Sequence, residues 1–250
     1  MLKGIDVSTQ QGNIDWSRVS ADFAMIKATQ GRGQGAVTRL LSRFTDSKFK
    51  RNIANCRCPA GVYHYFTAQD KVTATAEADY FCSIIEPYRD RIKLWAALDV
   101  ESFYLDRLGK TELTAIVMTA LERIESRGFK PMLYTNPNYL IYRFEPHAFD
   151  EYDIWLAHYG VSKPYSVPNM KIWQYGTTRT DGISTDVDAD YGYFALDENY
   201  KVGDKYTIRA GDRYTNGVTV PSRLVGKAYT IMQVREDRIL LGEISSWVKV

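Results

Sequence analysis

The stretch Leu94-Trp-Ala-Ala-Leu-Asp-Val-Glu101 places two carboxylates directly after a short apolar run. The run from Leu94 to Leu98 has the length and composition of a buried strand. Side chains two residues apart on a strand point to the same side, so we expect Asp99 and Glu101 to share one face at its carboxyl end. In a barrel of parallel strands, this is the end that carries the chemistry.

The closeness of Asp99 and Glu101 has an electrostatic consequence. Two crowded carboxyls do not both ionise easily, so the pKa of one of them is expected to rise. A protonated carboxylic acid beside an ionised carboxylate is the pair of groups that glycoside hydrolysis requires. Taken alone, an Asp-x-Glu pattern is common and is more typical of solvated charges at the end of a strand than of a catalytic pair.

Short apolar runs alternate with helical patterns through most of the chain, which predicts an α/β fold with a parallel sheet that closes into an irregular, TIM-like β/α barrel. The predicted strands are Leu2–Val7, Phe23–Ala28, Gly61–Phe66, Leu94–Val100, Met132–Thr135, Ile154–His158, Lys171–Tyr175 and a weak one near Val187. The predicted helices are Phe44–Ala54, Val72–Ile85 and Leu113–Arg127, the last with Thr111 as its N-cap.

The pattern changes after about residue 197. Five short β-like runs punctuated by turn residues predict a small all-β barrel, so we expect two domains, residues 1–197 and 198–250. The second domain carries nine Lys and Arg against six Asp and Glu, and its Tyr214, Tyr229 and Trp247 look exposed. A small positive charge favours an anionic surface only weakly, and it is also typical of a solvated face.

Composition excludes several classes of protein. A net charge of +2 over 250 residues argues against a dedicated nucleic-acid binder. Cys56, Cys58 and Cys82 are odd in number, the first two are too close for an ordinary disulfide, and a zinc site needs more ligands. We therefore expect structural cysteines, no metal and no cofactor.

The chain has no long apolar segment. No run of about 18 apolar residues predicts a membrane span. The N-terminus leads straight into a strand-like run without the apolar core of a signal peptide. We expect the chain to be made in the cytoplasm, so that any action outside requires another exit route.

Further acids and aromatic residues lie at the predicted strand ends. Asp6 closes the first strand, and Asp186 and Asp188 lie near the last. The first and last strands of a closed barrel are neighbours, so Asp6 and Asp188 are expected to face each other across its mouth. The aromatic residues at these ends, which would serve either for stacking on sugar rings or as plain core, are Tyr63, Tyr65, Tyr134, Trp155, Trp173 and Tyr175.

The order of these motifs carries a family resemblance. The motifs are Ile5-Asp-Val-Ser…Gln11-Gly…Ile14-Asp-Trp, Phe23-Ala-Met-Ile-Lys-Ala-Thr, Gly61-Val-Tyr-His-Tyr-Phe, Leu98-Asp-Val-Glu, Leu133-Tyr-Thr-Asn, Ile154-Trp-Leu-Ala, Ile172-Trp-Gln-Tyr and Val187-Asp. Together, over about residues 2–195, they resemble glycoside hydrolase family 25, the N-acetylmuramidase lysozymes of phage and bacterial lysins. The resemblance implies cleavage of the β-1,4 bond between N-acetylmuramic acid and N-acetylglucosamine in peptidoglycan.

The resemblance also implies roles for individual residues. Glu101 resembles the proton donor, Asp99 the carboxylate that orients or charges the substrate's acetamido group, and Asp6 and Asp188 the remaining acids. The expected substrate-binding aromatics are Tyr63, Tyr134, Trp155, Trp173 and Tyr65. The resemblance leaves open whether an enzyme nucleophile or the acetamido oxygen attacks.

Two positions depart from the family pattern. Gln10 stands where the family usually has Trp, and Gln30 stands where it often has Glu. Neither position is the proton donor, so these differences bear on the substrate subsites rather than on the chemistry.

The tail resembles bacterial SH3-type wall-binding domains. The matching stretches are Val202-Gly203-Asp204, Gly226-Lys-Ala-Tyr-Thr-Ile and Leu240-Leu-Gly…Trp247-Val. This implies that residues 198–250 bind a cell-wall peptide or polymer, the alternative being a β appendage that only stabilises the barrel.

Two further function classes stay open beside a peptidoglycan hydrolase. The first is a non-catalytic glycan-binding barrel, which would need no proton donor. The second is a chitinase-type N-acetylglucosaminidase, whose D-x-x-D-x-D-x-E pattern would place acids where this chain has Leu94 and Ala97.

Overall fold

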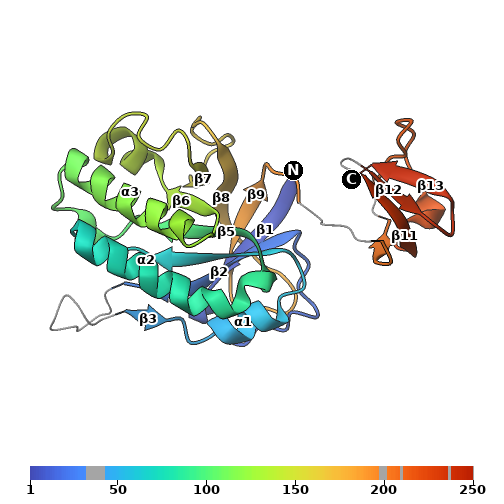
Figure 1. Ribbon diagram of the computed structural model, residues 1–250, viewed down its shortest axis with the longest axis horizontal. Helices are drawn as coiled ribbons and strands as arrows, with labels where there is room; N and C mark the ends of the chain where they lie inside the picture. Colours follow the sequence, from blue (N-terminus) through green and yellow to red (C-terminus); the bar gives the residue numbers. More distant parts are fainter. Residues whose placement is uncertain (32–42, 197–201, 209–210, 236–237, 250) are drawn as a thin grey trace. The chain divides into compact units, whose positions relative to one another are not determined.

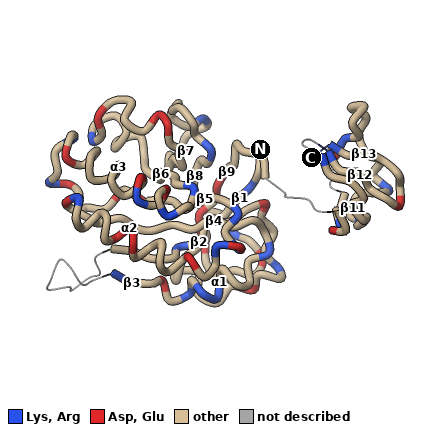
Figure 2. Tube along the Cα trace, in the orientation of Figure 1, with Lys and Arg blue, Asp and Glu red and all other residues tan. Residues whose placement is uncertain are grey.

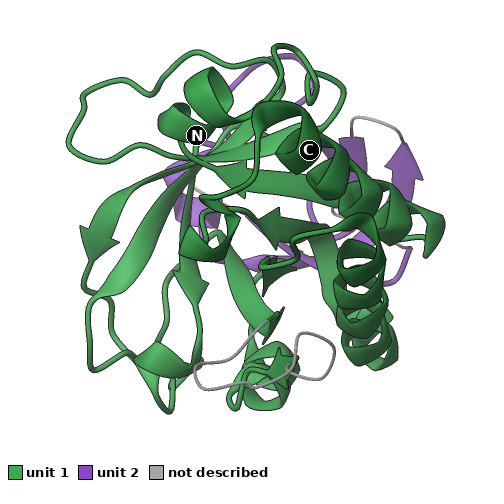
Figure 3. Ribbon diagram, turned by 90° about the vertical axis from the view of Figure 1, so that its left-hand side faces the viewer, with its two compact units in different colours: residues 1–195 green, residues 196–250 purple. Residues whose placement is uncertain are grey.

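The computed structural model describes residues 1–31, 43–196, 202–208, 211–235 and 238–249. The chain divides into two compact units, residues 1–195 (unit 1) and residues 196–250 (unit 2) (Figure 3). The boundary that the sequence predicts, between residues 197 and 198, lies outside the described residues. Over the described ranges, no helix is long and apolar enough to cross a membrane.

The described part of unit 1 forms a nine-stranded sheet that closes into a barrel (Figure 1). Its strands in chain order are β1 (Leu2–Val7), β2 (Phe23–Gln30), β3 (Phe44–Thr45), β4 (Ala60–Tyr65), β5 (Ile92–Asp99), β6 (Pro131–Thr135), β7 (Asp153–Ala157), β8 (Met170–Thr178) and β9 (Val187–Gly192). The ring closes because β1 pairs with both β2 and β9, and β3 lies outside the ring, beside β2.

The barrel is mixed rather than all parallel. Within the ring, the pairs from β1 and β2 through β8 are parallel, as the sequence predicts, but β9 runs antiparallel to both β8 and β1. Outside the ring, β3 runs antiparallel to β2. The prediction of a wholly parallel sheet was therefore wrong for the last strand. Residues 179–186, which join β8 to β9, are too few for the crossover that a parallel pair requires.

Three α-helices cover the outer face of the barrel on the side of β2, β4, β5 and β6 (Figure 1). They are α1 (Phe49–Asn55), α2 (Lys71–Ile85) and α3 (Lys110–Ser126). Shorter helical turns are η1 (Thr9–Gln11), η2 (Glu86–Arg91), η3 (Phe103–Leu105) and the π-helical η4 (Tyr139–Arg143). Along the trace of this unit, Lys and Arg positions are interspersed with Asp and Glu positions (Figure 2).

Two helix starts differ from the prediction. Phe44 and Thr45 pair with Gln30 and Thr29 as β3, so the first helix begins only at Phe49. Thr111 does not cap the third helix, which begins at Lys110 after Gly109. The Thr111 hydroxyl donates to the Glu145 carboxylate instead, because a charged acceptor lies within reach.

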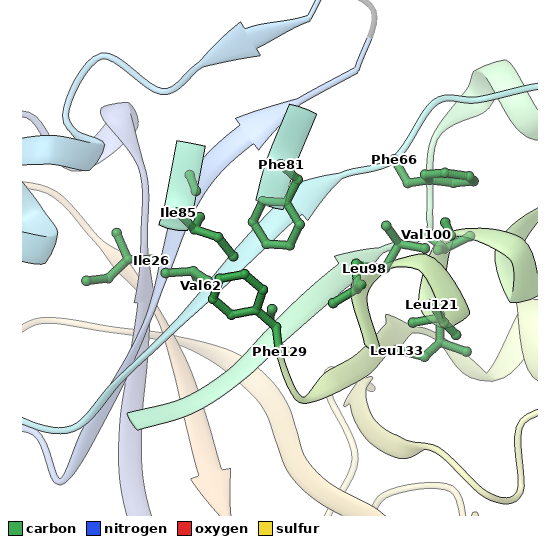
Figure 4. Close-up of a cluster of buried hydrophobic side chains, with 14 of the residues drawn as sticks. Ile26, Val62, Phe66, Phe81, Ile85, Leu98, Val100, Leu121, Phe129 and Leu133 are labelled. Carbon is green, nitrogen blue, oxygen red and sulfur yellow. The ribbon is translucent and has the colours of Figure 1, made fainter. Parts of the chain in front are cut away.

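The main core lies between the helices and the outer face of the strands (Figure 4). Its fully buried side chains include Ile26, Val62, Leu98 and Leu133 from the strands and Phe81, Ile85 and Leu121 from the helices. Because side chains alternate along a strand, packing Val62 and Leu98 outward turns Tyr63 and Asp99 into the barrel. The apolar core thereby determines which polar residues face the interior.

Unit 2 is a four-stranded antiparallel sheet with a core of its own. Its elements are β10 (Lys205–Thr207), η5 (Ser222–Leu224), β11 (Ala228–Arg235), β12 (Arg238–Leu241) and β13 (Ser246–Lys249). Of the five β-like runs predicted for this unit, the one at residues 218–220 is reduced to an isolated bridge between Thr219 and Arg213. Tyr229 was wrongly predicted to be exposed: it is buried in this core, while Tyr214 and Trp247 are half-buried.

Candidate active site

A pocket of about 400 Å³ opens at the carboxyl end of the parallel strands. Its lining residues are Asp6, Lys27, Tyr63, Tyr65, Asp99, Glu101, Tyr134, Trp155, Ala157, Tyr159, Gln174 and Asp188. Eight of the nine residues that the sequence singles out as catalytic or substrate-binding line this pocket, and Trp173 does not. Residues from all eight strands of the ring, or from the segments that directly follow them, converge on this cavity.

Asp99 and Glu101 occupy the inner and outer parts of one pocket wall. Asp99 is the last residue of β5 and is only 6% exposed, whereas Glu101 lies two residues further on and is exposed. Asp99 Oδ1 is buried and has no hydrogen-bond partner among the described residues. The Asp-x-Glu spacing therefore yields one buried carboxyl with an unused acceptor and one accessible carboxyl.

Asp6 and Asp188 form the opposite wall, where the barrel closes. They are direct partners in the β1–β9 ladder. Gln174 Nε2 donates to Asp6 Oδ2 at 2.7 Å, and Gln174 Oε1 accepts hydrogen bonds from Tyr134 Oη at 2.8 Å and Tyr159 Oη at 2.6 Å. The buried amide thus connects an acid to two phenol groups of the pocket.

Burial raises the pKa of the pocket carboxyls. Burial and then the Glu101 charge raise the pKa of Asp99 well above its ordinary value, while Lys27 opposes the shift. The pKa of Glu101 is also raised, mainly because the pocket walls partly shield this accessible carboxyl from solvent and further by the charge of Asp188, against the opposing effects of a Tyr134 hydrogen bond and Lys27. The pair therefore retains a proton at a pH at which free carboxyls are ionised.

The pKa values of Asp6 and Asp188, the acids of the opposite wall, are also raised. Burial, followed by the charges of Asp190 and Asp188, raises the pKa of Asp6 well above its ordinary value, although the Gln174 hydrogen bond opposes this. Burial also raises the pKa of Asp188. Among the residues that line the cavity, the positive charge that faces these acids is that of Lys27. Its Nζ lies 5.0 Å from the centroid of the Tyr65 ring.

The aromatic residues form the floor and sides of the pocket. Trp155 is 1% exposed and packs edge-on against Tyr63 and Tyr134, with ring centroids 5.8 and 4.6 Å away. Its Nε1 donates to Asp190 Oδ1 at 2.8 Å, beneath the cavity. Trp155 therefore supports the two tyrosines rather than offering an open face of its own.

The sequence analysis missed four residues of this region: Lys27, Tyr159, Gln174 and Asp190. Lys27 and Gln174 are polar residues inside apolar strand runs, which is a signal that they face a cavity rather than the core. Asp190 follows Asp188 at strand spacing and points to the same side. Tyr159 follows the end of β7 in a loop, where the sequence carries no periodic signal.

Trp173 lies on the outer face of β8, because its neighbour Gln174 faces inward. Its Nε1 donates to the His158 carbonyl oxygen at 2.8 Å, and it lines a different hollow. Asp186 also lies outside the pocket, where it is exposed and forms an ion pair with Arg179. No group of three or more His, Cys, Asp or Glu in the described ranges is arranged to hold a metal ion.

The chain is similar in sequence and in fold to known lysozymes. Lysozyme M1 of Streptomyces globisporus is 32% identical over 206 residues, which span 75% of this chain but just under two thirds (66%) of that protein. The crystal structure of the lysozyme from Streptomyces coelicolor is 26% identical, with a TM-score of 0.59 over 78% of this chain and 93% of that one.

A third likeness concerns the fold alone. The spore cortex lytic enzyme SleM of Clostridium perfringens is 19% identical, with a TM-score of 0.70 over 99% of this chain and 86% of that one. The sequence model of glycosyl hydrolases family 25 matches residues 5–183, a range that contains Asp6, Asp99 and Glu101. The chain is therefore a glycoside hydrolase that belongs to family 25.

Proposed function

We propose that this chain is a lysozyme that cleaves the β-1,4 bond between N-acetylmuramic acid and N-acetylglucosamine in peptidoglycan. The observation that carries the proposal is the convergence of Asp6, Asp99, Glu101 and Asp188 on one aromatic pocket. Lysozyme M1 and the Streptomyces coelicolor protein are both named as lysozymes, which supports the choice of substrate.

Glu101 is the proton donor in this proposal. Its carboxyl is the accessible member of the pair, so it can reach the glycosidic oxygen, and its raised pKa keeps it protonated. As the bond between the anomeric carbon and the glycosidic oxygen breaks, the proton passes to that oxygen and the leaving sugar departs as an alcohol. Glu101 is left as a carboxylate that can later accept a proton from water.

Asp99 binds and orients the substrate's acetamido group in this proposal. Its unpaired Oδ1 is a buried acceptor at the pocket wall and can take a hydrogen bond from the acetamido N–H. Because Asp99 and Glu101 titrate as a pair, the state with the proton on Glu101 leaves Asp99 ionised for this role. The same charge also stabilises the positive charge that develops at the anomeric carbon.

Asp6 and Asp188 supply acceptors on the opposite wall. Either can hold the attacking water or stabilise the oxocarbenium-like transition state. The anomer of the first product distinguishes the routes: retention indicates attack by an enzyme carboxylate or by the acetamido oxygen, and inversion indicates direct attack by water.

Unit 2 is the part that we assign to attachment at the bacterial wall, as an SH3-like domain. It has a separate core and a net positive charge, and the fold likeness to the spore cortex lytic enzyme extends over 99% of the chain. Its half-buried Trp247 has the Arg235 guanidinium 5.2 Å from its ring centroid, an arrangement suited to a peptide or polymer with polar and apolar groups. The site of action in this proposal is the cell wall.

One experiment tests the reaction. Purified peptidoglycan is digested, the new reducing ends are reduced with borohydride, and the products are identified by mass spectrometry. Reduced muramic acid ends are expected. Reduced glucosamine ends would instead identify an N-acetylglucosaminidase, and no new ends would indicate a glycan-binding barrel.

Matched carboxyl-to-amide variants link the result to the pocket. Glu101→Gln should abolish the release of reducing ends, while Glu122→Gln, an exposed position on α3, should leave it unchanged. Equal loss in both variants would contradict the assignment of Glu101.

A further inference from the structure

The outer face of β8 and β9 is not covered by a helix. Residues 158–169 and 179–186, all of them described, connect β7, β8 and β9 without helical structure, whereas α1, α2 and α3 cover the other side of the barrel. Where a helix would pack, the strands carry four aromatic side chains pointing outward. These are Trp173, Tyr175, Tyr191 and Tyr193.

The four side chains form one ordered cluster. Trp173 and Tyr191 are direct partners in the β8–β9 ladder. The Tyr175 and Tyr191 rings are stacked, with centroids 4.2 Å apart and planes at 16°, and the Trp173 centroid lies 5.8 and 5.6 Å from them. Tyr193 is 41% exposed at the edge, so aromatic surface remains open to solvent.

A hollow of about 520 Å³, the aromatic hollow, lies over this cluster. Its other lining residues are Met1, Val161, Ser162, Lys163 and Pro164. It shares no lining residue with the catalytic pocket. It is therefore a separate feature of the barrel wall rather than an extension of the cavity that holds the acids.

The loop of residues 158–165 holds the aromatic hollow in shape. Trp173 Nε1 donates to the His158 carbonyl, and the Tyr165 amide donates to His158 Nδ1 at 2.9 Å. Tyr159, in the same loop, donates to Gln174 in the catalytic pocket. Because these hydrogen bonds hold the loop in place, binding of a ligand requires little further ordering of the loop.

The chemistry of the hollow matches an acidic amino-sugar polymer. The negative faces of aromatic rings attract the weakly positive C–H faces of pyranose rings, and phenol and Ser162 hydroxyls can bond to sugar hydroxyls. Lys163 is exposed on the rim, and Lys3 is the β1 ladder partner of Tyr191 on the same face. These two cations complement the carboxylates carried at every second sugar, which lie on the lactyl group of muramic acid where the glycan is peptide-free and on the attached stem peptide where it is not.

We propose that the aromatic hollow is a second glycan-binding site, outside the catalytic pocket, for a peptidoglycan strand. This rests on the proposed function, because it takes its ligand from the same polymer. A strand held here keeps the barrel against the wall while another stretch is cut, which raises the local concentration of substrate without contributing to the chemistry.

The first test measures binding by the full chain with Glu101→Gln, which does not consume the ligand. The probe is a soluble, peptide-free tetrasaccharide of alternating N-acetylglucosamine and N-acetylmuramic acid, titrated by calorimetry. Two binding events are expected, and Tyr193→Ala with Lys163→Ala should weaken one of them about tenfold or more, the loss of roughly one good contact. Tyr142→Ala with Lys50→Ala, both exposed elsewhere, is the matched control.

Two further arms separate the possible failures. Lys163→Glu reverses a charge on an exposed loop and should weaken the same event even if Tyr193→Ala does not fold. A chitin tetrasaccharide, which lacks lactyl carboxylates, should bind the hollow more weakly. Unchanged binding in both hollow variants, or equal binding of chitin, would overturn the proposal.

The active chain distinguishes this inference from the proposed function. The hollow variants should solubilise insoluble walls more slowly while cutting the soluble tetrasaccharide at the wild-type rate. If the wild-type chain does not cut either substrate, the lysozyme assignment is wrong. If the hollow variants act on both substrates at the wild-type rate, only the proposal of a second glycan-binding site is wrong.

Discussion

Gln174 Nε2 donates to Asp6 Oδ2 at 2.7 Å and so joins β8 to β1 inside the barrel. Both side chains are buried, and the amide oxygen of Gln174 is occupied by two tyrosine hydroxyls. The orientation of the amide is therefore determined, with its N–H toward the acid. Gln174 positions Asp6 and lowers its pKa, against the effect of burial.

Gln174→Ala should reduce turnover strongly while the chain still folds. Removing the amide leaves Asp6 Oδ2 and the Tyr134 and Tyr159 hydroxyls without their partner, at a cost of about 1–3 kcal/mol in unfolding free energy. We expect kcat to fall by roughly one to two orders of magnitude, measured on soluble glycan, if a similar energy is lost in the transition state. Gln233→Ala, at an exposed position on β11 of unit 2, should change neither quantity, and an equal effect there would contradict this role.

Glu101→Gln should lower kcat by ~10²–10⁴-fold, the usual contribution of a general acid. The amide is nearly isosteric but has no proton to donate to the leaving oxygen. The melting temperature should stay close to that of the wild type, because Glu101 is exposed. Retention of more than about a tenth of wild-type turnover would place the proton donor elsewhere, since the loss would lie far below this range.

Activity should depend on pH as a bell, with an alkaline limb that reports the loss of the proton held by Asp99 and Glu101. Lys27 lowers the pKa of both carboxyls. Lys27→Met should therefore raise both pKa values and move the alkaline limb to higher pH, whereas Lys27→Arg should leave it in place. The measurement is the pH profile of kcat/KM, and a limb that stays fixed or moves downward in Lys27→Met would count against this electrostatic account.

In the Asp190→Asn variant, the free energy of unfolding should fall less than in the wild type as the pH rises. Burial raises the pKa of Asp190 from 3.8 to about 8, although the Trp155 hydrogen bond opposes this. The folded state thus holds a proton that the unfolded state releases, and the resulting stability is full below about pH 4 and is lost as the pH rises through 8. Asn keeps the acceptor for Trp155 and cannot ionise.

The advantage of Asp190→Asn in melting temperature should consequently grow between pH 5 and pH 8 and level off above that. At pH 8.5 the variant should be more stable than the wild type by at least about 1 kcal/mol, the low end for a buried group left unpaired. A constant difference across the series would show that Asp190 does not carry this proton.

Residues 1–197 alone should still cut soluble wall fragments, because unit 1 contains the pocket and has its own core. Removal of unit 2 should weaken attachment to intact walls much more than it affects turnover of fragments. Residues 198–250 fused to a fluorescent reporter should decorate cells. Equal lysis of intact walls by both forms, without decoration by the fusion, would reduce unit 2 to an appendage.

The order of the strands and the positions of the acids could be predicted because both depend on local sequence. Trp95 to Leu98 are buried, as the apolar run predicts, and two-residue spacing then brings Asp99 and Glu101 to one wall. The direction of β9 could not be derived in this way, since the alternating pattern Val187-Asp-Ala-Asp is compatible with either direction. The length of its connection to β8 was the usable signal.

Whether an aromatic side chain points into or out of the barrel was harder to predict than its location at a strand end. Trp173 and Trp155 both follow isoleucine in similar motifs, yet one lies outside the barrel and the other beneath the pocket. The inward position of Gln174 decides the first case, and a polar residue within an apolar strand was the clue. In unit 2, Tyr229 is buried because it pairs with Tyr206 across the sheet, a contact that depends on long-range register.

The pairing of β1 with β9 also has a consequence for the stage of synthesis at which the catalytic pocket is completed. The Asp6–Gln174 contact spans 168 residues, and Asp188 enters only with the last strand of the barrel. Contacts so distant along the chain close late, because the entropy of the intervening loop opposes them. We therefore expect a nascent chain to remain without catalytic activity until almost all of unit 1 has been synthesised.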